Sequence, residues 1–143
     1  MPRLATTLMA GLLSLASVAA QAAETASLIR SPHCDCCLGY AEELRRSGFV
    51  VAVTDAEDLS LVKRQHGVPE ALEGCHTTLI GGYVVEGHVP VAIVSKLLRE
   101  RPDVTGISLP GMPAGSPGMS GEKTEAFTVY QFGDGAQTVF AVE

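Results

Sequence analysis

Three of the four cysteines of this chain lie within four consecutive positions, in the segment Ser31-Pro32-His33-Cys34-Asp35-Cys36-Cys37. Cys34 and Cys37 have the Cys-x-x-Cys spacing of thiol–disulfide chemistry, and Cys36 fills a position between them. A helix that begins at such a cluster lowers the pKa of its thiols, because free N–H groups in its first turn stabilise thiolate. Three crowded thiolates repel one another, so the cluster indicates either a disulfide or a soft metal ion.

The elements around the cluster are expected to alternate between strand and helix. Residues 26–29 form a short apolar strand before it, and residues 38–46 form an amphipathic helix after it. Residues 49–53 are a continuous apolar run, typical of a strand that is buried on both faces and runs parallel to its neighbour. A second helix is expected over residues 58–66, and a short helical turn over residues 69–72.

A hairpin follows, and its turn fixes a pairing register. Residues 77–80 and 83–86 read as two short strands joined across Gly81-Gly82, a two-residue turn signal. In this register Ile80 faces Tyr83, and Thr77 faces Glu86. Continued outward, the same register brings Cys75 level with His88.

The order of the elements predicts where Cys75 lies. A third helix over residues 90–98 completes the series β-α-β-α-β-β-α, which is thioredoxin-like. In that topology the third strand runs against the first. Cys75 and His76 therefore begin the third strand at the end of the sheet where the first strand delivers the turn of residues 34–37. His88 returns to the same end, so one site is expected to hold all four cysteines.

The last third of the chain changes composition. Residues 107–125 are rich in proline and glycine and are expected to form a long loop, which carries Met112 and Met119. Residues 127–132 and 138–142 alternate around a Gly-Asp-Gly turn and predict a C-terminal β-hairpin. The fold class predicted is thus α/β, thioredoxin-like, with a long Pro/Gly/Met loop. Each methionine offers a soft, uncharged thioether to Cu(I), or it fills a gap over the core.

The choice of metal follows from the softness of the sulfur ligands. Neighbouring Cys36 and Cys37 side chains are expected to diverge, which disfavours one tetrahedral zinc ion shared with Cys34. Each thiolate can instead bind a different ion of a cluster, as thiolates do with Cu(I). Copper, with several ions in one cluster, is therefore the leading cofactor and zinc the weaker one. A metal-free disulfide, Cys34–Cys37 or Cys37–Cys75, stays open.

The four histidines differ in how well their positions fit a role as metal ligands. His33 adjoins the cluster and either supplies nitrogen to a metal or is solvated at the surface. His88 is a candidate ligand or a cap of the third helix. His76 follows Cys75 directly, so its side chain is expected to point away from the site. His66 lies at a helix C-terminus, where interaction with the helix dipole accounts for it.

The opening of the chain reads as a targeting segment. Residues 1–23 combine an early arginine, an apolar stretch and small residues at the end, which predicts a secretory signal peptide and a mature domain over residues 24–143. Export predicts a periplasmic protein that has no membrane association after cleavage. The net charge of −6 argues against nucleic acid as a partner and suits a cation.

Five segments carry a resemblance to a known family, in order along nearly the whole mature chain: Cys34-Asp35-Cys36-Cys37, Gly67-Val68-Pro69, Cys75-His76-Thr77, Glu86-Gly87-His88-Val89-Pro90, and residues 110–119 with both loop methionines. In them the chain resembles the CopG-type copper-resistance proteins, which are periplasmic metal-binding proteins. The resemblance implies a thioredoxin-like fold and a proposed redox role in copper handling. It also implies copper binding at Cys34, Cys36, Cys37 and Cys75, with His88 as a candidate.

The cysteine pattern fits two functions. The first is a periplasmic protein that holds Cu(I) for sequestration, redox handling and resistance, with a metal ion and another periplasmic copper-handling protein as partners. The second is an enzyme, a thiol–disulfide oxidoreductase in which Cys34 attacks and Cys37 resolves the mixed disulfide. The second function needs only the Cys-x-x-Cys pair, whereas the first needs all four cysteines.

Overall fold

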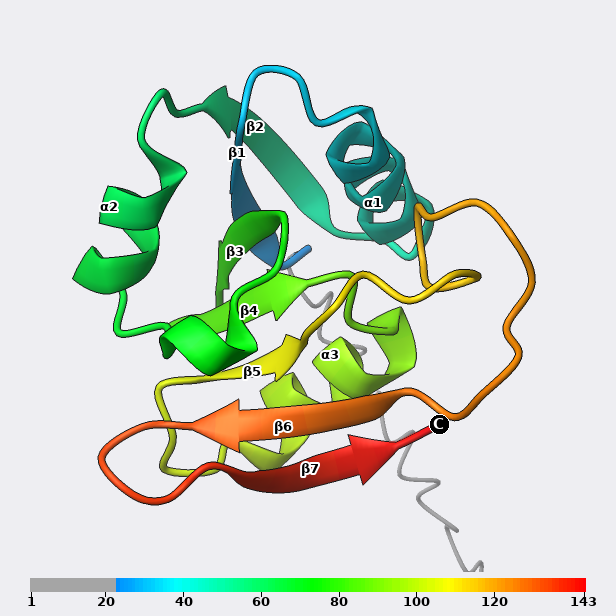
Figure 1. Cartoon of the computed structure of the whole chain (residues 1–143). Coiled ribbons are helices and arrows are strands. Elements are labelled where there is room, and N and C mark those ends of the chain that lie inside the picture. Colours follow the sequence, from blue (N-terminus) through cyan, green and yellow to red (C-terminus); the bar gives the residue numbers. More distant parts are fainter. Residues whose placement is uncertain (1–22) are drawn as a thin grey trace, which may run out of the picture.

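The computed structural model describes residues 23–143, so the predicted signal peptide of residues 1–23 lies outside the described residues except for its last position. Within that range the chain is a mixed α/β structure with three α-helices and one seven-stranded sheet, in the order β2-β1-β3-β4-β5-β6-β7 (Figure 1). No helix among residues 23–143 is long and apolar enough to cross a bilayer.

The bounds of the elements are as follows. The strands are β1 (Thr25–Arg30), β2 (Val50–Asp55), β3 (His76–Ile80), β4 (Tyr83–Gly87), β5 (Gly106–Leu109), β6 (Thr128–Phe132) and β7 (Thr138–Val142). The helices are α1 (Asp35–Arg46), α2 (Leu59–Gln65) and α3 (Val91–Glu100), with a 3-10 turn η1 (Glu70–Leu72) between α2 and β3. Up to α3, this order agrees with the one predicted.

The pairing around β1 and β3 confirms the predicted register. β1 runs parallel to β2 and antiparallel to β3. Ile80 pairs with Tyr83, and Thr77 pairs with Glu86. The turn between these strands has positive φ at both Gly81 and Gly82, a conformation that glycine adopts without steric cost.

Strand β2 departs from the prediction of a strand buried on both faces. It is the first strand of the sheet and pairs only with β1, so one of its sides is open. Val50 is 55% exposed, whereas Val51 and Val53 pack against the core. The sequence does not show this open side, because residues 49–53 contain no polar position to mark the outer face.

Strand β5 is the second correction, because the loop predicted from residue 107 begins only after Leu109. Gly106–Leu109 pairs parallel to β4 and antiparallel to β6, and all four of its residues are buried. A Cβ atom on Gly106 would collide with Val84 O, so the close approach of β4 and β5 requires glycine. The C-terminal hairpin of β6 and β7 is confirmed, and β5 joins it to the rest of the sheet.

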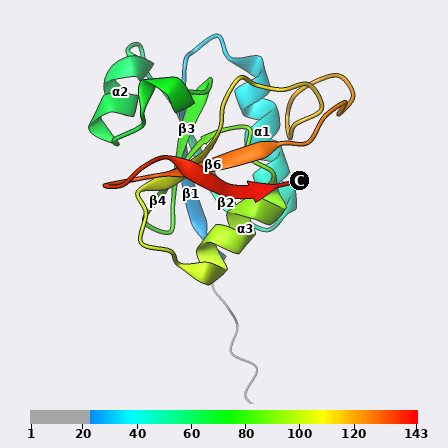
Figure 2. The same ribbon diagram turned by 60° about the horizontal axis from the view of Figure 1, so that its bottom comes forward.

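The helices divide between the two faces of the sheet (Figure 2). Helices α1 and α3 pack on one face, where Leu44 and Leu97 are buried among apolar strand residues. Helix α2 and η1 lie on the other face, over a smaller cluster that includes Leu72 and Val84. The site described below lies where α1 and the start of β3 meet, at one end of the sheet.

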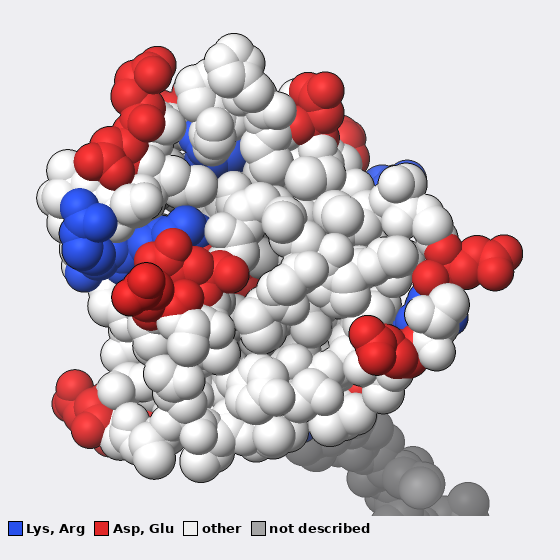
Figure 3. Space-filling view, viewed as in Figure 1, with Lys and Arg blue, Asp and Glu red and all other residues white. Residues whose placement is uncertain are grey.

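The surface fits the acidic composition. On the face shown in Figure 3, the charged side chains lie mainly around the margins, and the broad central area is formed by uncharged residues. Lys and Arg form only small, separate groups on this face. It therefore offers no continuous basic surface to a nucleic acid backbone.

Candidate metal centre

The cysteine turn joins β1 to α1. Cys34 is the N-cap residue of α1, and Cys36 and Cys37 lie in its first turn. Arg30, the last residue of β1, donates through Nη1 to Cys34 O at 3.0 Å. Its Nε also lies 2.9 Å from Asp55 Oδ1, an ion pair without hydrogen-bond geometry. The strand end thus holds the backbone of the turn, while the helix start presents the thiols at its N-terminus.

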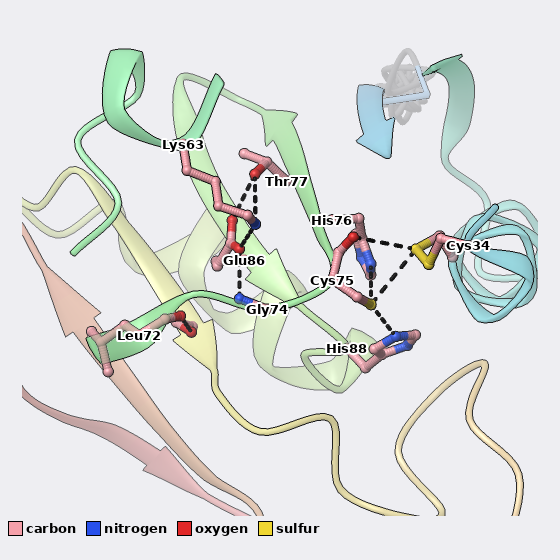
Figure 4. Close-up of polar contacts among 11 residues, drawn as sticks. Cys34, Lys63, Leu72, Gly74, Cys75, His76, Thr77, Glu86 and His88 are labelled. Carbon is pink, nitrogen blue, oxygen red and sulfur yellow. Dashed lines mark hydrogen bonds and ion pairs between the residues drawn. A yellow bond between two sulfur atoms is a disulfide. The ribbon is translucent and has the colours of Figure 1, made fainter. Parts of the chain in front are cut away.

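Cys75 lies immediately before β3, at the same end of the sheet as the cysteine turn. Because β3 runs antiparallel to β1, its first residue, His76, pairs with Arg30, and Cys75 comes just before it. The Cys75 Sγ lies 3.6 Å from Cys37 Sγ and 3.9 Å from Cys36 Sγ. The predicted convergence is confirmed, because the four cysteine sulfurs all lie within 4.8 Å of one another. Figure 4 shows the Cys75 sulfur beside the disulfide of Cys34.

The sulfurs are partly oxidised. Cys34 and Cys37 form a disulfide with their Cα atoms 5.4 Å apart, and Cys36 and Cys75 are free. Cys36 Sγ lies 3.4 Å from Cys34 Sγ. Of the two disulfides considered from the sequence, the Cys34–Cys37 bond is therefore the one formed, and two thiols remain beside it.

Neighbouring Cys36 and Cys37 do not diverge as predicted. Cys36 lies in the first turn of α1, where its side chain leans back toward the N-terminus of the helix and meets Cys34 there. Cys37 meets Cys75 across the gap between α1 and β3. With four sulfurs within 4.8 Å, the expectation that diverging side chains disfavour a single tetrahedral zinc ion is wrong. Thiolates suit both zinc and Cu(I), so the four sulfurs by themselves do not separate the two metals.

His88 faces Cys75 in a defined orientation. Its Nε2 lies 2.9 Å from Cys75 Sγ, and its Nδ1 lies 2.7 Å from Pro117 O. A carbonyl oxygen only accepts, so Nδ1 carries a proton and the lone pair of the neutral ring points from Nε2 to the sulfur. Burial lowers the pKa of His88, an effect that the bond to Pro117 opposes. The ring is therefore neutral, and its Nε2 lone pair is free to bind a metal ion.

His76 belongs to the site, contrary to the prediction that its side chain points away. Its Nδ1 lies 3.4 Å from Cys75 Sγ, and its ring packs 4.7 Å from Tyr40 and 4.8 Å from His88. Cys75, His76 and His88 thus bring three metal-binding atoms within 4.8 Å of one another. Side chains alternate only inside a strand, and Cys75 precedes β3, so adjacency to His76 did not separate the two.

Burial governs the protonation of this group. It lowers the pKa of His76 well below its ordinary value, and nearby His88 and Lys63 add to the effect. The His76 Nε2 has no hydrogen-bond partner within the described residues. Burial also raises the pKa of the Cys75 thiol to about 12, with Cys36 close by. In the metal-free chain, Cys75 is thus a thiol beside two neutral rings.

The long loop contacts the cysteine turn through its backbone. A Cβ atom on Gly118 would lie 2.9 Å from Cys36 O and 2.8 Å from Gly39 C, so this part of the loop rests directly on the start of α1. Met119 comes one residue later and is half-buried, whereas Met112 is 43% exposed. A ligand role for the two methionines stays a prediction.

Two histidines predicted from the sequence belong to neither group of possible metal ligands. His33 is exposed and belongs to neither group. His66 is the C-cap residue of α2, as its assignment to a helix end predicted. Lys63 and Glu86 are buried close to Cys75, although no motif in the sequence singles them out.

Comparison with known proteins gives three findings. A family model described as "Protein of unknown function, DUF411" matches residues 72–119. Two solved structures titled "Copper resistance protein copG", Form 2 and Form 1, are each 40% identical to this chain. Form 2 has a TM-score of 0.79, covering 85% of this chain and 99% of its own; Form 1 has 0.77, covering 83% and 96%. No curated protein matches the chain.

Proposed function

Because this chain belongs to the family of the copper resistance protein CopG, we propose that it binds copper as Cu(I) through Cys34, Cys36, Cys37 and Cys75. The observation that carries the proposal is the convergence of all four cysteine sulfurs within 4.8 Å, although Cys75 is 38 residues from Cys37. Thiolates are soft ligands that suit Cu(I) as well as zinc, and the copper resistance relatives favour copper for this site.

The donors around the sulfurs suit a cuprous ion. An external dithiol that reduces the Cys34–Cys37 disulfide supplies two electrons and two protons and is itself oxidised to a disulfide, which leaves four thiols in one cluster. His88 and His76 add neutral nitrogen donors on the side of Cys75. Copper binding displaces the thiol protons, and burial makes the proton of Cys75 costly to remove.

We extend the proposal to the place and use of the copper. The predicted signal peptide supports a periplasmic location, where the chain sequesters copper or changes its oxidation state and exchanges it with another copper-handling protein. The element order through α3 and the pairing of β1, β2 and β3 support assignment of this part to the thioredoxin-like class. The contact of Gly118 with the cysteine turn supports Met119 as an additional ligand.

Mass spectrometry under native conditions tests the cluster. The reduced mature chain is titrated anaerobically with Cu(I), and retention of two or more copper ions is expected. Cys36→Ser and Cys75→Ser, which leave the Cys34–Cys37 pair intact, are expected to lose that retention. Retention of a single zinc ion in preference to Cu(I), or copper binding unaffected by both substitutions, would refute the proposal.

A thiol–disulfide oxidoreductase is the second candidate, and the Cys34–Cys37 disulfide at the start of α1 favours it. In this reaction the reduced Cys34 attacks a substrate disulfide, and Cys37 then displaces the substrate thiol and re-forms the bond. Cys34 is half-buried and Cys37 fully buried, as suits an attacking and a resolving thiol. Reductase activity that survives Cys36→Ser but not Cys34→Ser would establish this alternative.

A further inference from the structure

A buried ion pair lies next to the metal centre on the α2 side of the sheet. The side chains of Lys63 and Glu86 are 4% and 0% exposed, and Lys63 Nζ contacts Glu86 Oε1 (Figure 4). Removing two charges from water costs several kcal/mol per ion, and the attraction between them often fails to offset it. Fold stability alone is therefore a weak reason for the pair.

The Glu86 carboxylate joins three separate segments of the chain. Its Oε1 accepts from Lys63 in α2 and also from the backbone N–H of Gly74 at 2.7 Å. Its Oε2 accepts from the hydroxyl of Thr77 in β3 at 2.7 Å. One contact thus reaches the backbone immediately before Cys75.

The backbone on either side of this contact is packed closely. A Cβ atom on Gly74 would lie 2.7 Å from Gly87 Cα, so the two glycines bring their segments almost into contact. The residues that follow them, Cys75 and His88, are the pair whose Sγ and Nε2 lie 2.9 Å apart. Glu86 precedes Gly87 and bonds to Gly74, so it ties the two segments together just before they present their side chains.

We propose that Glu86 is a positioning residue of the metal centre. Its carboxylate accepts the hydrogen bond of the Gly74 N–H and so fixes the position of the Cys75 sulfur relative to the His88 nitrogen. The ion pair with Lys63 keeps the carboxylate in place. The inference rests on the proposed copper function and adds residues that contact no metal. Partners of this kind, which orient a ligand from behind, are typically worth about 10- to 100-fold in metal affinity.

Two double variants separate positioning from charge and from folding. Lys63→Met with Glu86→Gln removes both charges and keeps an oxygen for the Gly74 N–H. Lys63→Met with Glu86→Leu removes both charges and the acceptor at similar volume. Neither leaves an unpaired buried charge, so both are expected to fold. Tyr83→Phe is the control, because it removes a bond to Pro102 O at the opposite end of β4.

The first readout is Cu(I) affinity, measured by competition with a chromophoric cuprous chelator under anaerobic conditions. The Leu double variant is expected to bind about 10- to 100-fold more weakly than wild type. The Gln double variant and Tyr83→Phe are expected to stay within a few-fold of wild type. Equal affinity of the two double variants, whether high or low, would overturn the positioning role.

The second readout needs no metal, so it separates this inference from the proposed function. Wild type that fails to bind Cu(I) refutes the copper proposal alone. NMR of the reduced, metal-free chain then reports hydrogen exchange at the Gly74 amide and proximity between Cys75 and His88. Faster exchange and lost proximity in the Leu double variant, but not in the Gln one, support positioning. Unchanged values in both variants overturn it.

Discussion

The contact of the long loop with α1 can be tested with two glycines that have the same φ. Gly118 and Gly111 both have a φ of +81°, so an alanine at either position carries a left-handed strain of about 1 kcal/mol. They differ in surroundings. A Cβ atom on Gly118 would meet the backbone of Tyr40, Gly39 and Cys36, whereas nothing lies within 4 Å of one on Gly111.

Gly118→Ala is therefore expected to lift the loop off α1. The adjacent Pro117 carbonyl then moves away from His88 Nδ1, and one partly buried hydrogen bond worth about 1 kcal/mol is lost. Gly118→Ala is thus expected to destabilise the loop by about 2 kcal/mol, whereas Gly111→Ala destabilises it by about 1 kcal/mol. Because Pro117 fixes which His88 nitrogen faces Cys75, Cu(I) affinity should fall about 10- to 100-fold for Gly118→Ala only.

Thermal unfolding and anaerobic Cu(I) competition of the two variants provide the assay. Both variants should remain folded, because the sheet and its helices do not depend on this loop for their hydrophobic cores. Equal Cu(I) affinity of the two variants would refute the reasoning, since it would mean that loop position does not reach the metal centre.

Three further predictions concern protons and the core. Apparent Cu(I) affinity should rise between pH 6 and 8, about tenfold per pH unit for each proton displaced, because the metal-free Cys75 thiol keeps its proton until about pH 12. Competition titrations measure this slope, and an affinity that does not change with pH would contradict thiolate binding at Cys75. The depressed pKa of His76 means that the unfolded chain binds a proton that the folded chain does not, so stability is complete above the ordinary value of 6.5 and is lost as pH falls below it. Denaturant unfolding should show His76→Phe losing less stability than wild type between pH 6.5 and 5, by up to about 1.4 kcal/mol per pH unit; parallel losses would contradict a neutral buried ring. Leu97→Ala, in the core on α3, should lower the free energy of unfolding by about 2–5 kcal/mol and leave copper stoichiometry unchanged in the folded fraction, and a lost ion would show that the centre depends on global stability.

Order and spacing along the chain were enough to locate the site. Three cysteines at the start of a helix, a two-glycine hairpin and an antiparallel third strand are enough to place Cys75 opposite residues 34–37. The same register placed His88 beside Cys75. These inferences hold because strand direction and a two-residue turn leave little freedom in which backbone positions meet.

Strand β5 and the exposure of β2 lay beyond such reasoning. A four-residue strand that precedes a proline- and glycine-rich loop has no periodicity to mark it, and its partners, β4 and β6, are distant in sequence. Whether an apolar run is central or at an edge depends on how many strands lie beyond it. The local sequence pattern does not show how many strands lie beyond a given strand.

By itself, the amino-acid sequence determined the soft-ligand chemistry of this protein and the end of the sheet at which that chemistry gathers. Only the tertiary structure decided which contacts surround the sulfurs. The His76 ring lies beside Cys75, the Pro117 carbonyl accepts from His88, and Glu86 accepts from the backbone N–H just before Cys75. These contacts join residues far apart in the chain, and they depend on side-chain direction and on burial. Both are properties of the packed molecule, since they arise only when separate segments exclude water together.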